Sequence, residues 1–273
     1  MLQQNAGLRS YAARERKRVQ GWLARVDAEI IMTMLLAQVE AELGGAVAEI
    51  GIHHGKCLIE LCLGLRPEER AYGIDIFDAQ HMNQDRSGKG DRRMLEANLT
   101  RFGVAADRVV IDSRSSQEVK PSDIMDAVGP VRLFSVDGGH WLEIVRSDLR
   151  LAEAVLAPHG VIALDDFLRT EWPDVSAGYF GWFATRERPL VPFAIGFNKL
   201  YLCEDRWVST YAAALQRNVF LRRFLTKRAV MQGCEVPIYQ SFIVPDWSRR
   251  RKGKALVPLL MPELWGRFAR PRG

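Results

Sequence analysis

The chain has 273 residues, of which 48% are hydrophobic and 26% are charged. This balance is ordinary for a globular protein with a full-sized core, and it excludes a largely disordered chain. The formal net charge of +5 is uneven, because residues 1–25 carry +5, residues 249–273 carry +7 and the segment between them carries −7. Basic ends of this kind are typical of solvated termini, although nucleic acid, anionic lipid and acidic proteins also bind such segments.

The cysteines and the first apolar run indicate a compartment. Cys57, Cys62, Cys203 and Cys234 show neither CxxC spacing nor the density of a secreted disulfide scaffold, so we expect reduced thiols. The start is polar, which argues against a secretory leader, and the apolar run IIMTMLLA from residue 30 is too short to span a bilayer. We therefore expect a cytoplasmic protein without a membrane span.

Residues 1–45 are predicted to form a helical extension, followed by alternating strands and helices. In the extension, RVDAEIIMTMLLAQVEAEL has apolar residues at helical spacing, and Gly44 and Gly45 end it. The alternation predicts right-handed βαβ units, and so an α/β fold with a Rossmann-like, doubly wound and mostly parallel sheet. The predicted strands are 46–52, 71–77, 108–113, 131–137 and 160–166, and the helices between them are 56–65, 92–103, 116–128 and 141–157.

The pattern changes after Phe167. Residues 170–183 are predicted to be a loop or short helix over the sheet edge, and residues 192–205 to be an antiparallel hairpin around the turn GFNK. Residues 211–225 are again helical in pattern, and the tail beyond Trp247 is basic and weakly patterned. These features divide the chain into an extension (1–45), a ligand-binding domain (46–205) and a C-terminal helical region with a basic tail (206–273).

The first two predicted strands end in groups that suit a nucleoside. EIGIHHG follows the first strand, and its Gly51 and Gly55 allow the backbone to come close to a ligand. Asp75 ends the second strand, where a carboxylate can accept both ribose hydroxyls. The GxGxxG pattern is absent, because Ile52 and His53 follow Gly51, and this argues against a dinucleotide. Taken singly, Gly51 and Gly55 would also suit a tight turn, and Asp75 would also suit a helix cap.

These residues carry a family resemblance. VAEIGIHHG resembles the ExGxxxG motif of class I S-adenosylmethionine-dependent methyltransferases, and GIDIF resembles their acidic second strand. The resemblance covers about residues 45–203, and it implies a methyltransferase domain at 46–205 that binds S-adenosylmethionine. The cofactor-binding residues that it implies are Glu49, Gly51 and Gly55 at the methionine part, Asp75 at the ribose, and Asp112 and Ser113 near the adenine.

Acidic residues follow two further strands. Asp137 ends one strand and the pair Asp165 and Asp166 ends the next, so three carboxylates can converge beside the cofactor. Carboxylates without cysteine ligands suit a hard cation such as Mg²⁺, and these three are the predicted metal ligands. His140 stands three residues after Asp137 and suits a general base near neutral pH, so both are predicted catalytic residues. Each residue alone could instead cap a turn or a helix.

These offsets resemble those of metal-dependent O-methyltransferases of the catechol and caffeoyl-coenzyme A type. In this chain His140 stands where those enzymes have a lysine, and Asp166 stands where they have an asparagine. With these two differences, the segments DGGH and LAPHGVIALDDF resemble more closely a bacterial group that includes macrolide-sugar O-methyltransferases. The resemblance implies an O-methyltransferase, an enzyme assisted by Mg²⁺ or a similar cation, that acts on a hydroxyl of a sugar-bearing or other small metabolite.

The acceptor and the partners are less well defined by the sequence. Aromatic residues after Phe167 could line an acceptor site beside Trp141 or belong to the core; they are Trp172, Tyr179, Phe180, Trp182 and Phe183. One alternative is an RNA methyltransferase that uses the basic ends, which the acidic middle and the absence of an NPPY-type motif disfavour. The other is a non-catalytic relative that binds a nucleoside. The sequence is also compatible with a homo-oligomer.

Overall fold

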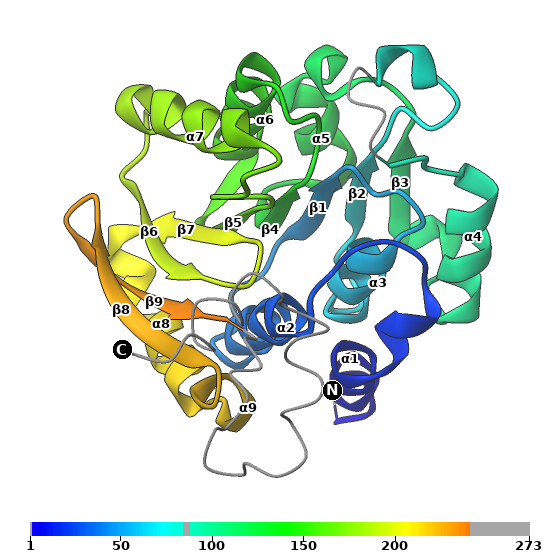
Figure 1. Cartoon of the computed structure of the whole chain (residues 1–273). Helices are drawn as coiled ribbons and strands as arrows, with labels where there is room; N and C mark the ends of the chain where they lie inside the picture. The colour runs from blue at the N-terminus through cyan, green and yellow to red at the C-terminus, as the bar shows by residue number, and fades with distance from the viewer. Residues whose placement is uncertain (1, 84–87, 241–273) are drawn as a thin grey trace, which may run out of the picture. The chain divides into compact units, whose positions relative to one another are not determined.

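A single mixed sheet organises the part of the chain that the computed structural model describes, residues 2–83 and 88–240 (Figure 1). Within these residues nine strands pair in the order β3-β2-β1-β4-β5-β7-β6-β9-β8. The five strands of the parallel half are β1 (Ala46–Ile50), β2 (Ala71–Ile74), β3 (Val109–Asp112), β4 (Val131–Val136) and β5 (Leu156–Leu164). The remaining strands are β6 (Leu190–Ile195), β7 (Leu200–Glu204), β8 (Leu225–Met231) and β9 (Cys234–Tyr239).

Two hydrophobic clusters cover the two faces of the sheet. One face packs against α1 (Leu2–Ala13), α2 (Arg25–Glu40), α3 (Lys56–Leu63), α4 (Arg92–Arg101), α8 (Val208–Arg217) and α9 (Val219–Arg222). The other packs against α5 (Pro121–Val128), α6 (Leu142–Val155) and α7 (Pro173–Thr185) (Figure 1). Because both faces are covered, the central strands are mostly apolar, and all residues of β1 and β4 are buried, including Glu49, Arg132 and Ser135.

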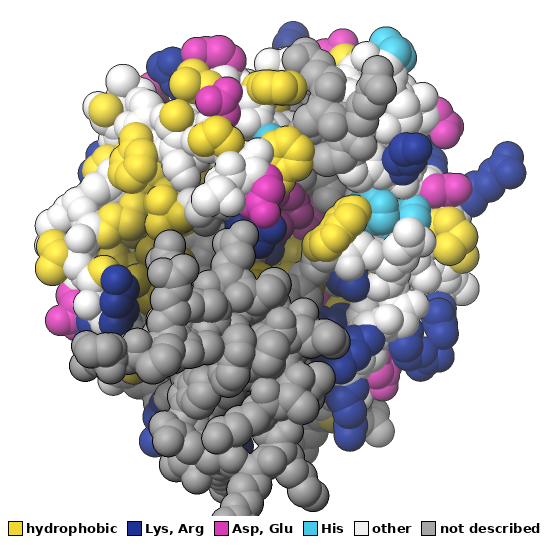
Figure 2. All heavy atoms as spheres, viewed as in Figure 1, with side chains coloured by type: hydrophobic (Ala, Val, Ile, Leu, Met, Phe, Trp, Pro, Cys, Tyr) yellow, Lys and Arg dark blue, Asp and Glu magenta, His cyan; other side chains and the backbone are white. Residues whose placement is uncertain are grey.

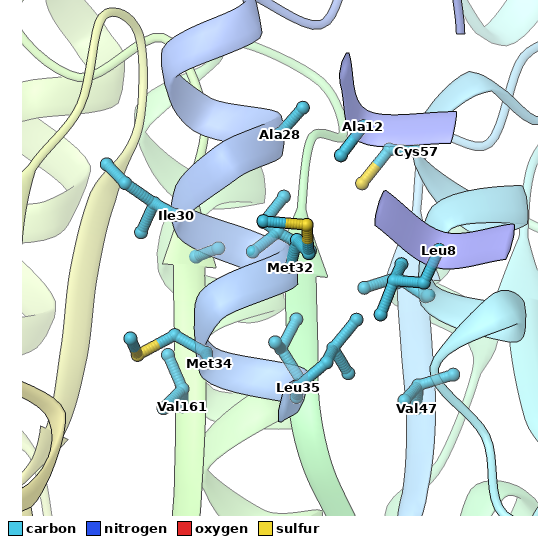
Figure 3. Packing of buried hydrophobic residues seen from close by; sticks show 14 of the residues in the cluster. Leu8, Ala12, Ala28, Ile30, Met32, Met34, Leu35, Val47, Cys57 and Val161 are labelled. Carbon is cyan, nitrogen blue, oxygen red and sulfur yellow. The ribbon is translucent and has the colours of Figure 1, made fainter. Parts of the chain in front are cut away.

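The extension before β1 is part of this core. Figure 3 shows Ile30, Met32 and Leu35 of α2 among side chains of neighbouring elements, including Val47 of β1 and Val161 of β5. Leu8 and Ala12 of α1 and Cys57 of α3 belong to the same cluster. The buried face of α2 places its first turn beside the sheet, so the polar side chains of that turn reach the site described below.

The predicted α/β fold, its mostly parallel sheet and its antiparallel hairpin are confirmed. The extension is two helices rather than a continuous one, since a short 3₁₀ helix, Glu15–Arg18, and an irregular stretch separate α1 from α2. Residues 173–185 form a full helix, α7, with Pro173 at its first position, which a proline favours. β5 begins at Leu156, four residues before the predicted start at 160.

The prediction of a helical region from residue 206 onward is correct for α8 and α9 and misses β8 and β9. These strands form an antiparallel hairpin around Gln232 and Gly233, which both have positive φ, the requirement of a tight two-residue hairpin turn. The helical pattern of LQRNVFLRRFL hides the strand that follows it, because β8 is largely exposed and has no apolar alternation to reveal it. The predicted basic tail lies outside the described residues.

Candidate active site

A pocket with a volume of about 1110 Å³ lies at the carboxyl ends of β1, β2, β4 and β5. Ligands bind at this edge in open α/β sheets. Its wall also includes residues 21–24, before α2, and the turn at 197–199 between β6 and β7. Figure 2 shows acidic, histidine and hydrophobic side chains meeting on one face of the molecule.

The turn after β1 requires glycine because of what packs against it. Gly51 has a φ of +81°, and a Cβ there would lie 1.7 Å from the carbonyl oxygen of Asp137. Gly55, with a φ of +86°, begins α3, and a Cβ would lie 2.6 Å from Leu95. Gly51 lines the pocket and Gly55 does not. The first glycine therefore brings the backbone to the ligand space, whereas the second packs the helix.

Glu49 and Asp75 face the pocket from β1 and from the end of β2. The Asp75 carboxylate accepts hydrogen bonds from the backbone N–H of His53 at 2.7 Å and of Phe77 at 2.8 Å. Burial raises the pKa of Asp75 above its usual value, against these two bonds. Burial also raises the pKa of Glu49 to about 7. Since a carboxylate has about four lone-pair sites, Asp75 retains capacity for further donors.

Asp112 and Ser113, predicted near the adenine, do not line the pocket. The Asp112 carboxylate is paired with Arg114 at 2.6 Å and accepts a hydrogen bond from Tyr72 at 2.7 Å, and the Ser113 hydroxyl accepts one from Arg92. The chain turns back after β3, so that residues 114–117 reach the pocket instead. The prediction missed this shift, because sequence spacing does not define the path of an irregular turn.

Three predicted residues converge on one point of the pocket. Asp137, His140 and Asp166 each place one ligand atom within 4.8 Å of the others, and Nε2 of His140 lies 3.0 Å from Oδ2 of Asp166. The His140 ring stacks on Trp172, with ring centres 4.1 Å apart and planes at 16°. Asp166 has a φ of +54°, a conformation that non-glycine residues adopt rarely and that is enriched at functional sites.

The neighbouring Asp165 makes different contacts. Its Oδ2 forms an ion pair of 2.8 Å with Lys199, which is only 2% exposed, and its Oδ1 accepts a hydrogen bond of 2.7 Å from Asn198. The same Asn198 amide donates to Oδ1 of Asp166 at 2.7 Å, so it bridges the two carboxylates. Both partners come from the β6–β7 turn, about 33 residues further along the chain.

The charges of this cluster are interdependent. Burial, and then the Asp165 carboxylate, raise the pKa of Asp137 well above its usual value. Burial acts in the same direction on Asp165, but the Lys199 ammonium and the hydrogen bonds outweigh it and lower the pKa of Asp165. Asp165 and Asp137 in turn raise the pKa of Lys199 well above its usual value, against the effect of burial. The Lys199 ammonium therefore favours the ionised form of Asp165.

Asp27 of α2 supports the β6–β7 turn. It is fully buried, and it accepts hydrogen bonds of 3.0 Å from the backbone N–H of Asn198 and from the Tyr201 hydroxyl. Gly196 is required beside it, because a Cβ there would lie 1.8 Å from Oδ1 of Asp27. Burial, and then Asp165, raise the pKa of Asp27 to about 7. The first turn of α2 is thus connected to the acidic cluster through Asn198.

A cation fits the chemistry of the site. Asp137 and Asp166 offer carboxylate oxygens that hard divalent cations prefer, and His140 adds a nitrogen that softer ones accept. Asp165, the third predicted ligand, is outside this group of three and is paired with Lys199 and Asn198.

The aromatic residues predicted either to line an acceptor site or to belong to the core divide into two groups. Tyr179 and Trp182 are fully buried in the core beneath the sheet face, and neither Phe180 nor Phe183 lines the pocket. Trp172 and Trp141 do line it. Helix α7 explains the division, because its inward face packs on α6 and only its N-terminal end reaches the pocket.

Sequence reasoning missed Asp27, Asn198 and Lys199. The buried run around Lys199, FNKLYLC, carries a signal, since a lysine at the start of an apolar strand needs an anionic partner if it is buried. Asp27 carries a similar signal in an apolar helix. Neither signal identifies the partner, which depends on tertiary packing.

The fold is the class I methyltransferase fold. A family profile described as a methyltransferase domain matches residues 48–167. No functionally curated protein has a significant sequence match to the chain. Residues 48–167 therefore match a methyltransferase domain, in agreement with the enzyme class predicted from the sequence.

Solved structures agree with the fold. The O-methyltransferase NovP has a TM-score of 0.58 at 11% identity, over 74% of this chain and 98% of that chain. Cofactor-bound Rv0187 from MTB has a TM-score of 0.46 at 21% identity, over 72% and 87%. The O-methyltransferase TomG from Streptomyces achromogenes, in complex with SAM, has a TM-score of 0.46 at 18% identity, over the same shares. Among the described helices, none is long and apolar enough to cross a bilayer.

Proposed function

We propose that the protein transfers the methyl group of S-adenosylmethionine to a hydroxyl oxygen of a small molecule, assisted by a divalent cation such as Mg²⁺. The observation that carries this proposal is the convergence of Asp137, His140 and Asp166 within 4.8 Å, in the same pocket as Gly51 and Asp75. The similarity of fold to the O-methyltransferase NovP is in keeping with an oxygen acceptor.

The cofactor is assigned to the β1 and β2 side of the pocket. Asp75 would accept hydrogen bonds from the ribose hydroxyls, and Glu49 and Gly51 would lie at the methionine part. Residues 114–117 take the place near the adenine that we expected for Asp112 and Ser113, since they line the pocket. Bound S-adenosylmethionine supplies a methyl group on a positively charged sulfur, which becomes a neutral thioether as the methyl–sulfur bond breaks and the methyl–oxygen bond forms.

His140 removes the proton that the acceptor hydroxyl loses when this bond forms. Its Nε2 is paired with Asp166, and this carboxylate would stabilise the imidazolium that forms when His140 takes up the proton. The stack on Trp172 fixes the plane of the ring. Asp137 and Asp166 would hold the divalent cation, which would lower the pKa of the acceptor hydroxyl. Asp165, Asn198 and Lys199 hold the two aspartates in position.

A calorimetric titration with S-adenosylhomocysteine, with and without Mg²⁺, tests the cofactor assignment. We expect binding to the wild-type protein and a loss of at least tenfold in affinity for Asp75→Ala, because the ribose loses its acceptor. Asp126→Asn, a change at an exposed aspartate of α5, is the matched control and should bind as the wild type does. The titration is followed by an assay of methyl transfer to hydroxylated acceptors.

Absence of S-adenosylhomocysteine binding under both conditions would contradict the proposal as a whole. Binding that is retained in Asp75→Ala would contradict only the assignment of the ribose site. Transfer to a hydroxylated acceptor that is unaffected by a chelator and by added Mg²⁺ would remove the cation from the proposal and leave the rest.

A further inference from the structure

Asp148 of α6 is a buried carboxyl to which the proposed chemistry gives no role. The residue is 1% exposed, and within the described residues neither carboxyl oxygen has a hydrogen-bond partner of standard geometry. Burial raises its pKa to about 7, and the neighbouring Ser116 side chain opposes this rise. Because a carboxyl in such a position costs free energy of folding, a contribution to stability does not explain its presence.

The Asp148 carboxyl fills the space beneath the turn at 137–140. A Cβ on Gly138 would lie 2.4 Å from its Oδ2, and the φ of Gly138 is outside the left-handed region. Glycine is therefore required at this position mainly by the carboxyl that packs against it, and not by the backbone conformation. Since the turn carries Asp137 at its start and His140 at its end, the carboxyl limits where both side chains can lie.

A small cavity places the same carboxyl beside the acidic cluster. The cavity has a volume of about 10 Å³, and its lining includes Asp148, Asp137, His140 and Asp166. This volume is at the lower limit for one water molecule, so the packing between the carboxyl and the cluster is close. Removing the carboxyl would enlarge the cavity and allow the side chains on its other side to shift.

The turn at 137–140 also touches the cofactor side of the pocket. A Cβ on Gly51 would lie 1.7 Å from the carbonyl oxygen of Asp137, so the two backbones are in direct contact. A shift of the turn would therefore displace Gly51, which is assigned to the methionine part of the cofactor. The position of the Asp148 carboxyl thus affects cofactor binding as well as the acidic cluster.

Asp148 has a second neighbour on the cofactor side. Ser116, whose side chain interacts with the carboxyl, is the first residue of a 3₁₀ helix at 116–118 that packs on α6. Ser116 also lines the pocket, in the turn at 114–117 that is assigned to the adenine. The carboxyl therefore lies between that turn and the turn at 137–140.

We infer that Asp148 is a positioning residue that sets the spacing between these two turns, and so aligns the bound cofactor with Asp137 and His140. This inference rests on the proposed function, which assigns the cofactor and the cation to the two sides of the pocket. Asp148 does not line the pocket itself, so it acts through Gly138 and Ser116. Misplacement of reacting groups by about 1 Å costs on the order of 10²-fold in rate, so the spacing of the two turns matters for transfer.

A double-mutant cycle with Gly138→Ala and Asp148→Ala tests this role in the full-length protein. Calorimetry measures the affinity for S-adenosylhomocysteine, and then for Mn²⁺ with S-adenosylhomocysteine bound, so no acceptor is needed. Each single variant should weaken both affinities by about threefold to tenfold, because the new methyl group meets the carboxyl in one and the turn loses its support in the other. In the double variant the methyl group occupies space that the carboxyl has left, so the effect of Gly138→Ala should fall to about twofold or less.

Two further variants separate positioning from stability. Asp148→Asn keeps the size of the side chain, and both affinities should stay within about twofold of wild type. Glu153→Gln is the matched control, since Glu153 is also buried on α6 but lies outside the pocket and accepts hydrogen bonds from Trp182 and from two backbone N–H groups. This change should lower the free energy of unfolding, measured with urea, and leave both affinities unchanged. Asp148→Ser takes the place of Asp148→Ala in the cycle if the alanine variant does not fold.

Three results would overturn the inference: wild-type affinities in Asp148→Ala, an equal effect of Gly138→Ala with and without the Asp148 carboxyl, or equal losses of affinity in Glu153→Gln. Failure of the wild-type protein to bind S-adenosylhomocysteine would overturn the proposed function and the inference with it. Failure of the wild type to bind Mn²⁺ alone counts against the cation of the proposed function, and the S-adenosylhomocysteine cycle then decides the inference. The two kinds of failure are therefore distinguishable.

Discussion

Residues 48–167, which match the methyltransferase family, and the segments outside them contribute to the pocket in different ways. The matched region supplies Glu49, Gly51 and Asp75 on one side and Asp137, His140 and Asp166 on the other. The outer segments supply Asp27, Asn198 and Lys199, which pair with or support the carboxylates, and the exposed rings of Trp22 and Phe197. The comparison teaches that the clustered carboxyl groups and His140 follow strand ends of the common fold, whereas the side chains that pair with these carboxyl groups come from additions to it.

The largest effect is expected in the matched region, from His140→Ala. Loss of the base should lower kcat by about 10²-fold to 10⁴-fold, with S-adenosylhomocysteine affinity nearly unchanged. Methyl transfer and calorimetry measure the two quantities. His81→Ala, at an exposed histidine outside the pocket, is the control.

The same variant separates two roles of His140. If Mn²⁺ affinity falls together with kcat, His140 is a metal ligand rather than a base. Turnover equal to that of the wild type would exclude both roles of His140. Residues 48–167 would then no longer be distinguished from the outer segments by a catalytic base.

Lys199→Met tests the outer segments. Removing one partner of a buried ion pair should cost about 3 to 5 kcal/mol of unfolding free energy, because Asp165 is left buried without its cation. Urea unfolding measures this, with Lys227→Met on the exposed strand β8 as control. Adding Asp165→Asn should restore part of the loss; a double variant that is no more stable than Lys199→Met would show that the pair is not coupled.

Asp148→Asn examines a buried carboxyl of the matched region. Asp148 is 1% exposed, and burial raises its pKa from 3.8 to about 7. The folded state therefore binds its proton more tightly than the unfolded state, and this group makes the protein less stable as the pH rises from about 4 to about 7. Asparagine lacks this titration, so the variant should gain stability relative to wild type over that range, by on the order of 2 to 4 kcal/mol.

Urea midpoints at pH 5 and pH 8 measure the Asp148 effect. Asp27 and Glu49 titrate in the same direction in both proteins, so the difference between variant and wild type isolates Asp148. An equal difference at the two pH values would contradict the expectation.

The smallest effect is expected for Asp27. Asp27→Ala leaves the Asn198 N–H and the Tyr201 hydroxyl without their acceptor, at a cost of about 1 to 3 kcal/mol, while Asp27→Asn keeps one acceptor and should cost less. Both variants should lower kcat severalfold through displacement of Asn198, with S-adenosylhomocysteine affinity unchanged. A kcat equal to wild type in Asp27→Ala would show that the outer segments support stability alone.

Much of the fold and part of the site were predictable from the sequence. The strands before Gly51, Asp75, Asp137 and Asp165 are short apolar runs between amphipathic helices, and parallel strands bring their ends to one edge, so convergence of these residues follows. Prediction failed where the local pattern was ambiguous. Residues 225–231 lack apolar alternation, and the path after Asp112 depends on an irregular turn.

The sequence by itself determined the alternation of strands and helices between residues 46 and 166 and the residue types at the strand ends, because periodicity and glycine positions are local properties. Only the tertiary structure decided that Asp165 pairs with Lys199, that Asp27 holds the β6–β7 turn, and that Trp22 and Phe197 share one pocket. These contacts join residues far apart in the chain. Their formation depends on how α2 and the hairpin pack on the sheet, and a buried charge acquires its partner only in that packing.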